Sequence, residues 1–427
     1  MVESKVGVFK ETEIGLIPED WSVVKLGDVA KVCAGGSAPQ GEEYFKRGKH
    51  PFIRVQHIHN EDFKVIGFDL ITDEAVKKYK LKLFPKGMIL FPKSGATVYL
   101  EKRALLPFDA YIVSHLCAVL AKDRNVLQKY LFYFLVWKKL AKKKESGYPT
   151  INLSEVKTLL IALPPLPEQQ KIAKVLDTIH RAIEIQDRII ETTKNLKKSL
   201  MQKLFHEGTK GEELKETEIG LIPKSWEVVR LGDDNILTQT QYGLSVKGQQ
   251  SGKYPIIRMN NLQNGQIWIN DLQFVDIDDK TFCKFKLNKG DILFNRTNSL
   301  ELVGKASIFN LEGGFVFASY LIRLKTNSSI LDPYFFNHYF NWGITQYRLK
   351  GLASTGVSQA NISATKLKTF KIPLPPLPEQ QEIANILSTI DRKIEIEQRG
   401  KDLLKQLFKT VLHKLMSGEI RLKDVKI

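Results

Sequence analysis

Two short groups of residues contain side chains that could bind a metal or catalyse a reaction. His57 and His59 are two residues apart, so a strand would place both imidazoles on one face, as part of a zinc ligand set. Glu155 and Lys157 form a Glu-x-Lys fragment found in some nucleases, with Asp109 upstream. No third ligand accompanies the histidines, and three-residue matches are common by chance. We therefore predict neither a catalytic residue nor a metal site.

Longer catalytic motifs are also absent from the sequence. It contains no GxxxxGK[ST] loop, the backbone cradle for nucleotide phosphates. It also lacks an Asn-Pro-Pro-Tyr stretch, the signature of amino-methyltransferases that act on adenine. The nearest string, Leu331-Asp-Pro-Tyr-Phe335, has no second proline. These absences favour a chain that binds rather than catalyses.

Arginine, asparagine and glutamine side chains instead follow several predicted strands. Arginine and asparagine can form paired hydrogen bonds to the edges of guanine and adenine, and a lysine-rich helix end suits phosphate. The alternative for each residue is an ordinary solvated position, including favourable placement of lysines at a helix C-terminus. The candidate DNA-binding residues are Arg54, Gln56, His57, Lys93, Ser94, Lys142, Lys143, Tyr148, Asn152, Arg258, Asn260, Asn261, Asn295, Arg296, Thr297, Asn298, Gln359 and Asn361.

These candidates lie within two copies of one sequence unit. The block KETEIGLIPEDWSVVKLGD at Lys10–Asp28 returns as KETEIGLIPKSWEVVRLGD at Lys215–Asp233, 205 residues later. The block LPPLPEQQ at Leu163–Gln170 returns unchanged at Leu374–Gln381, 211 residues later. Between the blocks only a skeleton of apolar residues and glycines matches, which suggests one scaffold with two different surfaces. The aligned segments include Lys86–Phe91 with Lys289–Phe294, and Ser146–Asn152 with Thr355–Asn361.

A long helix is predicted to follow each LPPLPEQQ block. Pro167 and Pro378 suit a first helical turn, and Glu168 and Glu379 suit the positive end of the helix dipole. Apolar residues then recur at steps of three and four, which indicates a coiled-coil seam. About 40 residues at roughly 1.5 Å each would make a rod on the order of 60 Å. Such a helix could be a packing element, a spacer between domains, or both.

The order of the blocks constrains how these helices pack. The second KETEIGLIP block directly follows the first helix, whereas its other copy begins the chain. If the two copies are related by a pseudo-twofold axis, the N-terminal block should lie near the end of the second helix. We therefore predict antiparallel helices and a circular arrangement of the chain.

The overall charge suggests a polyanionic partner. The 427 residues include 64 Lys and Arg against 47 Asp and Glu, a formal net charge of +17 with a pI near 9.4. Residues 16–162 carry 24 basic and 15 acidic side chains, and residues 221–373 carry 18 and 11, so the excess is shared as +9 and +7. The polyanion should therefore meet both halves.

Composition also excludes several classes of protein. Hydrophobic residues make up 43% of the chain, too much for a disordered protein, and no apolar run is long enough to span a membrane. No secretion signal is present at the start. Three widely spaced cysteines, Cys33, Cys117 and Cys283, argue against a disulfide framework. We expect a cytoplasmic protein.

The pattern predicts a mixed α+β fold. Two globular domains, each combining helices and strands, would be joined by two long antiparallel coiled-coil helices in a pseudo-twofold, circular arrangement. The expected divisions are residues 1–162 and 211–373 for the domains, 163–210 and 374–420 for the spacer helices, and 421–427 for a tail.

The sequence resembles the specificity (S) subunits of type I restriction–modification systems over essentially its whole length. The most specific motifs are IPxxWxVxxLGD at Ile17–Asp28 and Ile222–Asp233, and the helix starts at Pro164–Gln170 and Pro373–Gln381. The resemblance implies a non-catalytic subunit. Its two target-recognition domains would each bind one half of a bipartite, asymmetric site in double-stranded DNA.

The resemblance also implies a set of partner subunits. The paired helices would set the gap between half-sites and dock two modification subunits, which use S-adenosylmethionine. Restriction subunits, with ATP and Mg²⁺, would join through the complex, and the S subunit itself would hold no cofactor. Two alternatives remain at this point: a stand-alone DNA nuclease or methyltransferase with an unrecognised active site, and a coiled-coil scaffold that does not bind DNA.

Overall fold

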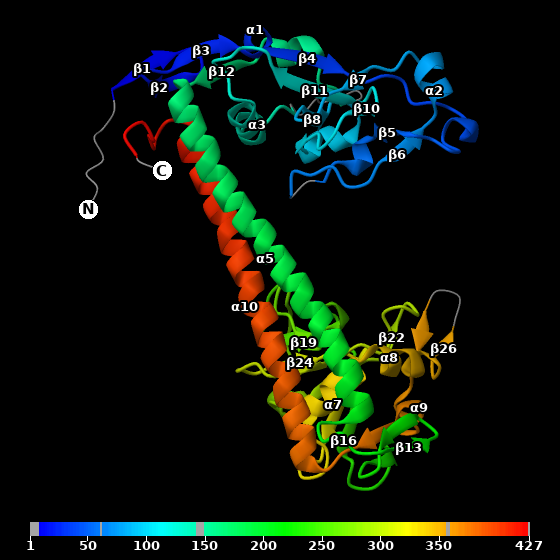
Figure 1. Cartoon of the computed structure of the whole chain (residues 1–427). Coiled ribbons are helices and arrows are strands. Elements are labelled where there is room, and N and C mark those ends of the chain that lie inside the picture. Colours follow the sequence, from blue (N-terminus) through cyan, green and yellow to red (C-terminus); the bar gives the residue numbers. More distant parts are fainter. Residues whose placement is uncertain (1–7, 60–61, 142–148, 356–358, 426–427) are drawn as a thin grey trace. The chain divides into compact units, whose positions relative to one another are not determined.

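The computed structural model describes residues 8–59, 62–141, 149–355 and 359–425, and the chain divides into two compact units (Figure 1). Unit 1 comprises Met1–Asp187 and Arg399–Ile427, and unit 2 comprises Arg188–Gln398. Each unit contains a mixed region of strands and short helices together with one part of each long helix. The long helices are α5 (Leu166–Glu207) and α10 (Leu377–Met416).

The described residues of unit 1 form two four-stranded sheets and two strand pairs. The sheets have the orders β6-β5-β10-β7 and β4-β11-β8-β9, and the pairs are β1-β2 and β12-β3. Its strands are β1 (Phe9–Thr12), β2 (Gly15–Pro18), β3 (Ser22–Lys25), β4 (Ala30–Ala34), β5 (His50–Ile53), β6 (Asp69–Ile71), β7 (Leu83–Phe84), β8 (Ile89–Pro92), β9 (Ala104–Leu105), β10 (Ala110–Ile112), β11 (Leu116–Ala121) and β12 (Leu160–Leu163). Its short helices are α1 (Leu26–Val29), α2 (Asp73–Lys78), α3 (Gln128–Trp137) and α4 (Leu153–Lys157).

Unit 2 repeats this plan with a larger central sheet. The sheet orders are β16-β25-β21-β23-β19-β18, β20-β17-β24 and β22-β27-β26, with the pairs β13-β14 and β15-β28. Its strands are β13 (Leu214–Thr217), β14 (Gly220–Pro223), β15 (Glu227–Arg230), β16 (Leu237–Tyr242), β17 (Tyr254–Ile257), β18 (Leu262–Gln263), β19 (Gln266–Ile267), β20 (Gln273–Val275), β21 (Ile292–Asn295), β22 (Thr297–Asn298), β23 (Ala306–Ile308), β24 (Val316–Phe317), β25 (Leu321–Thr326), β26 (Ser354–Thr355), β27 (Ala360–Asn361) and β28 (Lys371–Leu374). Its short helices are α6 (Asp279–Phe285), α7 (Pro333–Phe340), α8 (Gly343–Lys350) and α9 (Ala364–Lys368).

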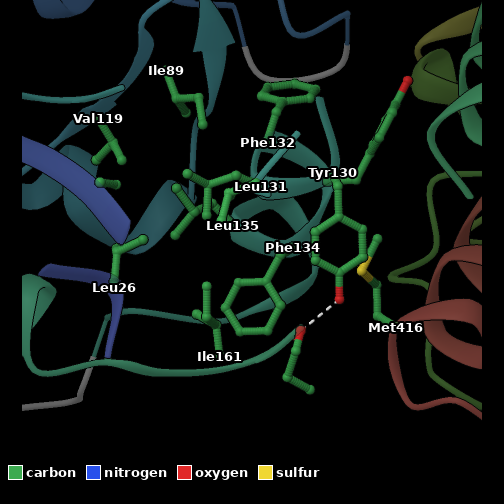
Figure 2. Packing of buried hydrophobic residues seen from close by; sticks show 14 of the residues in the cluster. Leu26, Ile89, Val119, Tyr130, Leu131, Phe132, Phe134, Leu135, Ile161 and Met416 are labelled. Atoms are coloured by element: carbon green, nitrogen blue, oxygen red, sulfur yellow. Dashed lines mark hydrogen bonds between the residues drawn. The ribbon is translucent and has the colours of Figure 1, made fainter. Parts of the chain in front are cut away.

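Helix α3 lies at the centre of the main core of unit 1. Six successive residues, Tyr130–Leu135, are buried, as expected of a helix that is apolar on every side. Figure 2 shows this helix packed against strand residues and against Met416 of α10, which belongs to the same apolar cluster. The Tyr130 hydroxyl donates a hydrogen bond of 2.6 Å to the carbonyl of Ala162, so its one buried polar atom is paired.

The sequence has helical patterns near 126–144 and 331–349, which predict one helix in each stretch. Within the described residues the structure has a shorter helix in the first stretch and two helices in the second. The first yields α3, which ends at Trp137. The second yields two helices, α7 and α8, separated at Asn341 and Trp342. The Asn341 amide donates to the carbonyls of Asn337 and Ala306, which ends α7, and Trp342 then adopts an extended backbone.

In each unit, a buried glutamate at the start of one long helix bonds to a tryptophan and to the residues that follow the other long helix. We call this set of contacts a closure. In unit 1, the carboxylate of Glu168 in the first turn of α5 accepts hydrogen bonds from Trp21 and from Arg421, which follows α10. In unit 2, Glu379 in the first turn of α10 accepts from Trp226 and from the backbone of Thr209, which follows α5. The end of each helix therefore meets the start of the other. This confirms antiparallel helices and a circular order of the chain, with the tryptophan blocks at both closures.

The neighbouring glutamines lock the same helix starts to the globular regions. Gln169 donates to the carbonyls of Pro164 and Asn125 and accepts from the backbone of Leu127. Gln380 makes the same three bonds with Pro375, Ile330 and Asp332. Both glutamines are fully buried, so the LPPLPEQQ block is a structural joint. Among the described residues, none of the helices has the length and apolar character of a membrane span.

Candidate nucleic-acid interface

In unit 2 the first candidate turn follows strand β17. The Arg258 amide donates to Asn261 Oδ1 at 2.9 Å, which closes a single 3-10 turn. Asn261 is fully buried, and its Nδ2 donates to the carbonyls of Trp268 and Asn270 at 2.9 and 3.3 Å. The Asn261 amide is therefore used within the protein, where it shapes the turn.

Two neighbouring side chains from this turn extend toward solvent. Arg258 Nη2 donates to the carbonyl and to Oδ2 of Asp271 at 3.0 and 3.1 Å, and Asn260 Nδ2 donates to the same carboxylate oxygen at 3.0 Å. Asp271 thus holds both polar groups in fixed positions. Asn260 remains exposed.

The second candidate turn of unit 2 follows strand β21. Asn295 is buried and donates to the carbonyl of Leu302 at 3.3 Å. The backbone of Arg296 is held from both sides, because its amide donates to Tyr320 at 3.0 Å and its carbonyl accepts from Ile362 at 2.9 Å. The Arg296 guanidinium lies 4.9 Å from the centre of the Tyr242 ring and donates to Ser319.

A small three-stranded sheet joins this turn to the distant loop near residue 360. Strand β22 pairs with β27, which places Thr297 opposite Asn361, and Asn361 Nδ2 donates to Thr297 Oγ1 at 3.2 Å. Asn298 Nδ2 lies 3.4 Å from the sulfur of Met259 in the first turn. The structure therefore brings the candidates after β17, those after β21 and Asn361 onto one surface, with Gln359 exposed beside it.

Unit 1 has the same first turn built from different side chains. The Arg54 amide donates to His57 Nδ1 at 3.0 Å, and the Arg54 guanidinium pairs with Asp69. His57 thus occupies the place of Asn261 and Asp69 that of Asp271. Burial lowers the pKa of His57, so the ring acts as a neutral acceptor that closes the turn. Gln56, the counterpart of Asn260, is exposed.

The second turn of unit 1 also keeps the backbone frame of unit 2. The Lys93 amide donates to His115 at 2.9 Å, and the Lys93 carbonyl accepts from Ile151 at 2.8 Å, as Arg296 does with Tyr320 and Ile362. Ser94 lies in the place of Thr297, and its hydroxyl lies 2.5 Å from His115 Nδ1. The frame is shared and the side chains on it differ.

The backbone pairing corrects the alignment of Ser146–Asn152 with Thr355–Asn361. Ser94 bridges to Thr150, just as Thr297 pairs with Asn361, so Asn361 corresponds to Thr150 and not to Asn152. Asn152 is the N-cap of α4 and shares a capping box with Glu155, and its counterpart is Ser363, the N-cap of α9. The error came from a gap-free match of short polar strings. Lys142, Lys143 and Tyr148 lie outside the described residues.

The groups considered for catalysis have structural partners. Glu155 caps α4, and Asp109 accepts from the backbone of Lys86 at 2.7 Å. Within the described ranges, no set of three or more His, Cys, Asp or Glu residues is arranged to hold a metal ion.

Sequence reasoning missed the two aspartates that hold Arg54 and Arg258, and it missed Tyr242, whose ring lies against the Arg296 guanidinium. The acids follow the arginines by 15 residues in unit 1 and 13 in unit 2, so the repeated Arg–Asp spacing was the available signal.

Comparison with known proteins places this duplicated architecture in one family. A family model described as the type I restriction modification DNA specificity domain matches residues 18–195 and 223–406. The chain belongs to this family. The match confirms the expected fold class and the prediction of a DNA specificity subunit that is not itself an enzyme.

Individual relatives extend over nearly the whole chain. The putative type I restriction enzyme MjaX specificity subunit of Methanocaldococcus jannaschii is 30% identical, covering 97% of both chains. The MjaIX specificity subunit of the same organism is 29% identical, covering 98% of this chain and 97% of the relative. The crystal structure of a type I restriction–modification S subunit from M. genitalium has a TM-score of 0.57 at 17% identity, covering 93% and 96%, and shows the same fold.

Proposed function

We propose that this chain reads a bipartite, asymmetric DNA site for a type I restriction–modification enzyme. Each of two target-recognition domains, residues 1–162 and 211–373, contacts one half-site. The spacer helices, residues 163–210 and 374–420, set the distance between half-sites, and residues 421–427 form a tail. The observation that carries this proposal is the pair of equivalent backbone turns that present different polar side chains.

We assign different roles to the exposed and buried candidates. Asn261, Asn295 and His57 hold the turns from within, because each is buried and makes at least one hydrogen bond to the backbone there. The contacts to DNA come from the more exposed side chains on the same turns. In unit 2 these are Arg258, Asn260, Arg296, Thr297, Asn298, Gln359 and Asn361, and in unit 1 they are Arg54, Gln56, Lys93 and Asn152. The proposal also includes Ser94, which is buried but lies on the second turn, and Lys142, Lys143 and Tyr148, which lie outside the described residues.

Exposed apolar residues on the long helices support docking of two modification subunits. Ile185 and Leu196 of α5 are 53% and 52% exposed, and their repeats in α10, Ile396 and Leu407, are 67% and 48% exposed. Unit 1 thus contains Ile185 and Leu407, and unit 2 contains their repeats, Ile396 and Leu196. Such apolar side chains on a solvent face suit contact with another protein. Two equivalent surfaces would accept two equivalent subunits, one on each unit.

The chemistry then belongs to the partners. Modification subunits would supply S-adenosylmethionine, and restriction subunits would join through the complex and bring ATP and Mg²⁺. The assembled enzyme would act on double-stranded DNA in the cytoplasm, and the S subunit would hold no cofactor.

Sequencing of modified DNA tests the proposal. The chain is co-expressed with its modification partner in a host without other adenine methylation, and methylated positions are mapped across the genome. A split motif with two defined parts and a fixed gap is the expected result. Replacing residues 16–162 with another recognition domain should change one part only. Methylation without a split motif, or a change in both parts, would overturn the proposal.

A further inference from the structure

The two long helices are near-repeats of one another, yet they contact each other differently in the two units. In unit 1, the ring of His180 on α5 faces Phe408 on α10 with centroids 6.2 Å apart, and Phe63 packs on both. In unit 2, Lys197 on α5 pairs with Asp391 on α10, with Nζ 2.6 and 2.7 Å from the two carboxylate oxygens.

These two contacts occupy equivalent positions of the repeat. Equivalent helix residues are 211 positions apart, as the buried pairs Ile172 with Ile383 and Leu176 with Leu387 illustrate. On this spacing His180 corresponds to Asp391, and Lys197 corresponds to Phe408. One layer of the helix pair is therefore aromatic in unit 1 and ionic in unit 2.

A neighbouring layer shows the same asymmetry. Lys401 on α10 pairs with Asp187 on α5 within unit 1, with 2.5 Å between Nζ and Oδ1. The equivalent positions in the repeat are Ile190 on α5 and Gln398 on α10. In both layers, therefore, the side chains in unit 1 differ in chemical type from those at the equivalent positions in unit 2.

The asymmetry has a consequence for pairing between two copies of the chain. In the antiparallel register of the structure, α5 against α5 of a second copy would place Lys197 beside His180 and Asp187 beside Ile190. The α10 pair would place Asp391 beside Phe408 and Lys401 beside Gln398. Each mismatch would occur twice. The side chains of Lys197 and Asp391 are each 17% exposed and that of Lys401 is 16% exposed, and a buried charge without its partner is strongly unfavourable. Asp187, which is 47% exposed, would contribute less.

The setting of the unit 2 pair makes its loss costly. The side chains of Lys197 and Asp391 are each only 17% exposed. Burial raises the pKa of Asp391, and the Lys197 charge opposes that rise. The charge and the hydrogen bonds of Lys197 are therefore what favours the ionised form of this carboxylate, and α10 meets this lysine on α5. His338 and Ser388 complete the polar cluster, with His338 Nε2 3.0 Å from Ser388 Oγ.

We propose that these two layers select the partner of each long helix, so that α5 joins α10 and two copies of the chain do not associate through like helices. The six residues are His180, Phe408, Lys197, Asp391, Asp187 and Lys401. Near-identical helices would otherwise be free to pair with themselves, and such selection by unfavourable alternatives is a known way to specify coiled-coil partners. This inference is independent of the DNA recognised by the chain.

The test gives the layer formed by His180 with Phe408 in unit 1, and by Lys197 with Asp391 in unit 2, the same side chains in both units of the full-length chain. The variant carries Lys197→Phe and Asp391→His, which copies the unit 1 layer into unit 2 and removes its discrimination. The matched control carries Lys197→Arg and Asp391→Glu, which preserves the charges. Each protein is refolded over a range of concentrations, its mass is measured by light scattering, and co-capture of tagged with untagged copies reports mixed oligomers.

The symmetrised variant should self-associate with a dissociation constant lower than that of the control by on the order of tenfold or more, while wild type and control behave alike. Equal self-association of folded variant and control would overturn the proposal. If Lys197→Phe with Asp391→His fails to fold, His180→Asp with Phe408→Lys copies the ionic layer into unit 1 and makes the same prediction. Wild-type chains that co-capture through like helices would also contradict it.

Discussion

The helix closures have the same tryptophan and glutamate side chains in the two units, whereas the recognition turns share backbone hydrogen bonds and differ in several side chains. At the closures, Trp21 with Glu168 and Trp226 with Glu379 keep both the side chains and the Nε1–Oε2 distance of 3.1 Å. At the turns, the backbone bonds of Lys93 and Arg296 are equivalent but the side chains differ. The frame is held by main-chain bonds, so side chains on it can change without altering its geometry. This separates stability from specificity within one domain.

The largest expected effect comes from breaking the closures. Glu168→Ala should lower the free energy of unfolding by about 3–5 kcal/mol, because it leaves Arg421 without its main partner and removes an acceptor from Trp21. Glu379→Ala should cost less, about 2–3 kcal/mol, because its shorter bonds come from neutral donors.

Urea unfolding monitored by tryptophan fluorescence and circular dichroism measures both changes. The exposed Glu11, in the hairpin next to the first closure, provides the control, and Glu11→Ala should stay within about 0.5 kcal/mol of wild type. A larger loss for Glu379→Ala than for Glu168→Ala would show that the ionic partner does not set the difference.

The second prediction sharpens the contrast at the turns. Asn260→Ala and Gln56→Ala change exposed residues at equivalent positions of unit 2 and unit 1. Each should weaken binding of the assembled complex by about 1–3 kcal/mol and relax one half-site only. Binding to DNA with single-base changes in each half-site measures this. Relaxation of the same half-site by both variants would refute the division between units.

The third prediction concerns a buried group found in only one unit. Burial, together with the Lys197 charge, lowers the pKa of His338 in α7 from its ordinary 6.5 to about 3. The ring stays neutral in the folded chain, whereas the unfolded chain binds a proton below pH 6.5. The contribution of the neutral His338 ring to the free energy of unfolding is therefore fully present above pH 6.5. It is lost progressively as the pH falls from 6.5 toward 3.

The loss between pH 7 and pH 5 should be about 1–2 kcal/mol for this residue. His338→Tyr introduces the residue that unit 1 has at the equivalent Tyr133, and it should flatten the dependence of unfolding free energy on pH. His57 and His180 of unit 1, whose pKa values burial also lowers, retain the remaining slope. An unchanged slope in the variant would show that His338 is not the titrating group.

The sequence predicted the closures far better than the turns, for physical reasons. The long helices follow from local signals: prolines and a glutamate at the start, then apolar residues at steps of three and four. Their antiparallel order followed from the position of the repeated block. By contrast, the bond between Asn361 and Thr297 joins residues 64 apart, and the contact between Asn298 and Met259 joins residues 39 apart. Neither has a periodic signal in the sequence.

Side-chain type was also an incomplete guide to exposure. Asn260 and Asn261 are identical neighbours, yet one is exposed and the other fully buried. The difference depends on the turn after β17, which directs Asn261 inward toward the carbonyls of Trp268 and Asn270. Composition could therefore nominate both residues but could not separate their roles.

The smallest expected effect separates framework from recognition at a single residue. Asn152 caps α4, and unit 2 has Ser363 at the equivalent cap, where its hydroxyl accepts from the Lys366 amide at 3.2 Å. Asn152→Ser should keep the cap and change the unfolding free energy by less than about 0.5 kcal/mol, whereas Asn152→Ala should lose about 1 kcal/mol. If the Asn152 amide also contacts a base, the serine variant should weaken binding at the first half-site despite its preserved stability. Normal DNA binding by Asn152→Ser would assign Asn152 to the framework alone, together with Ser363.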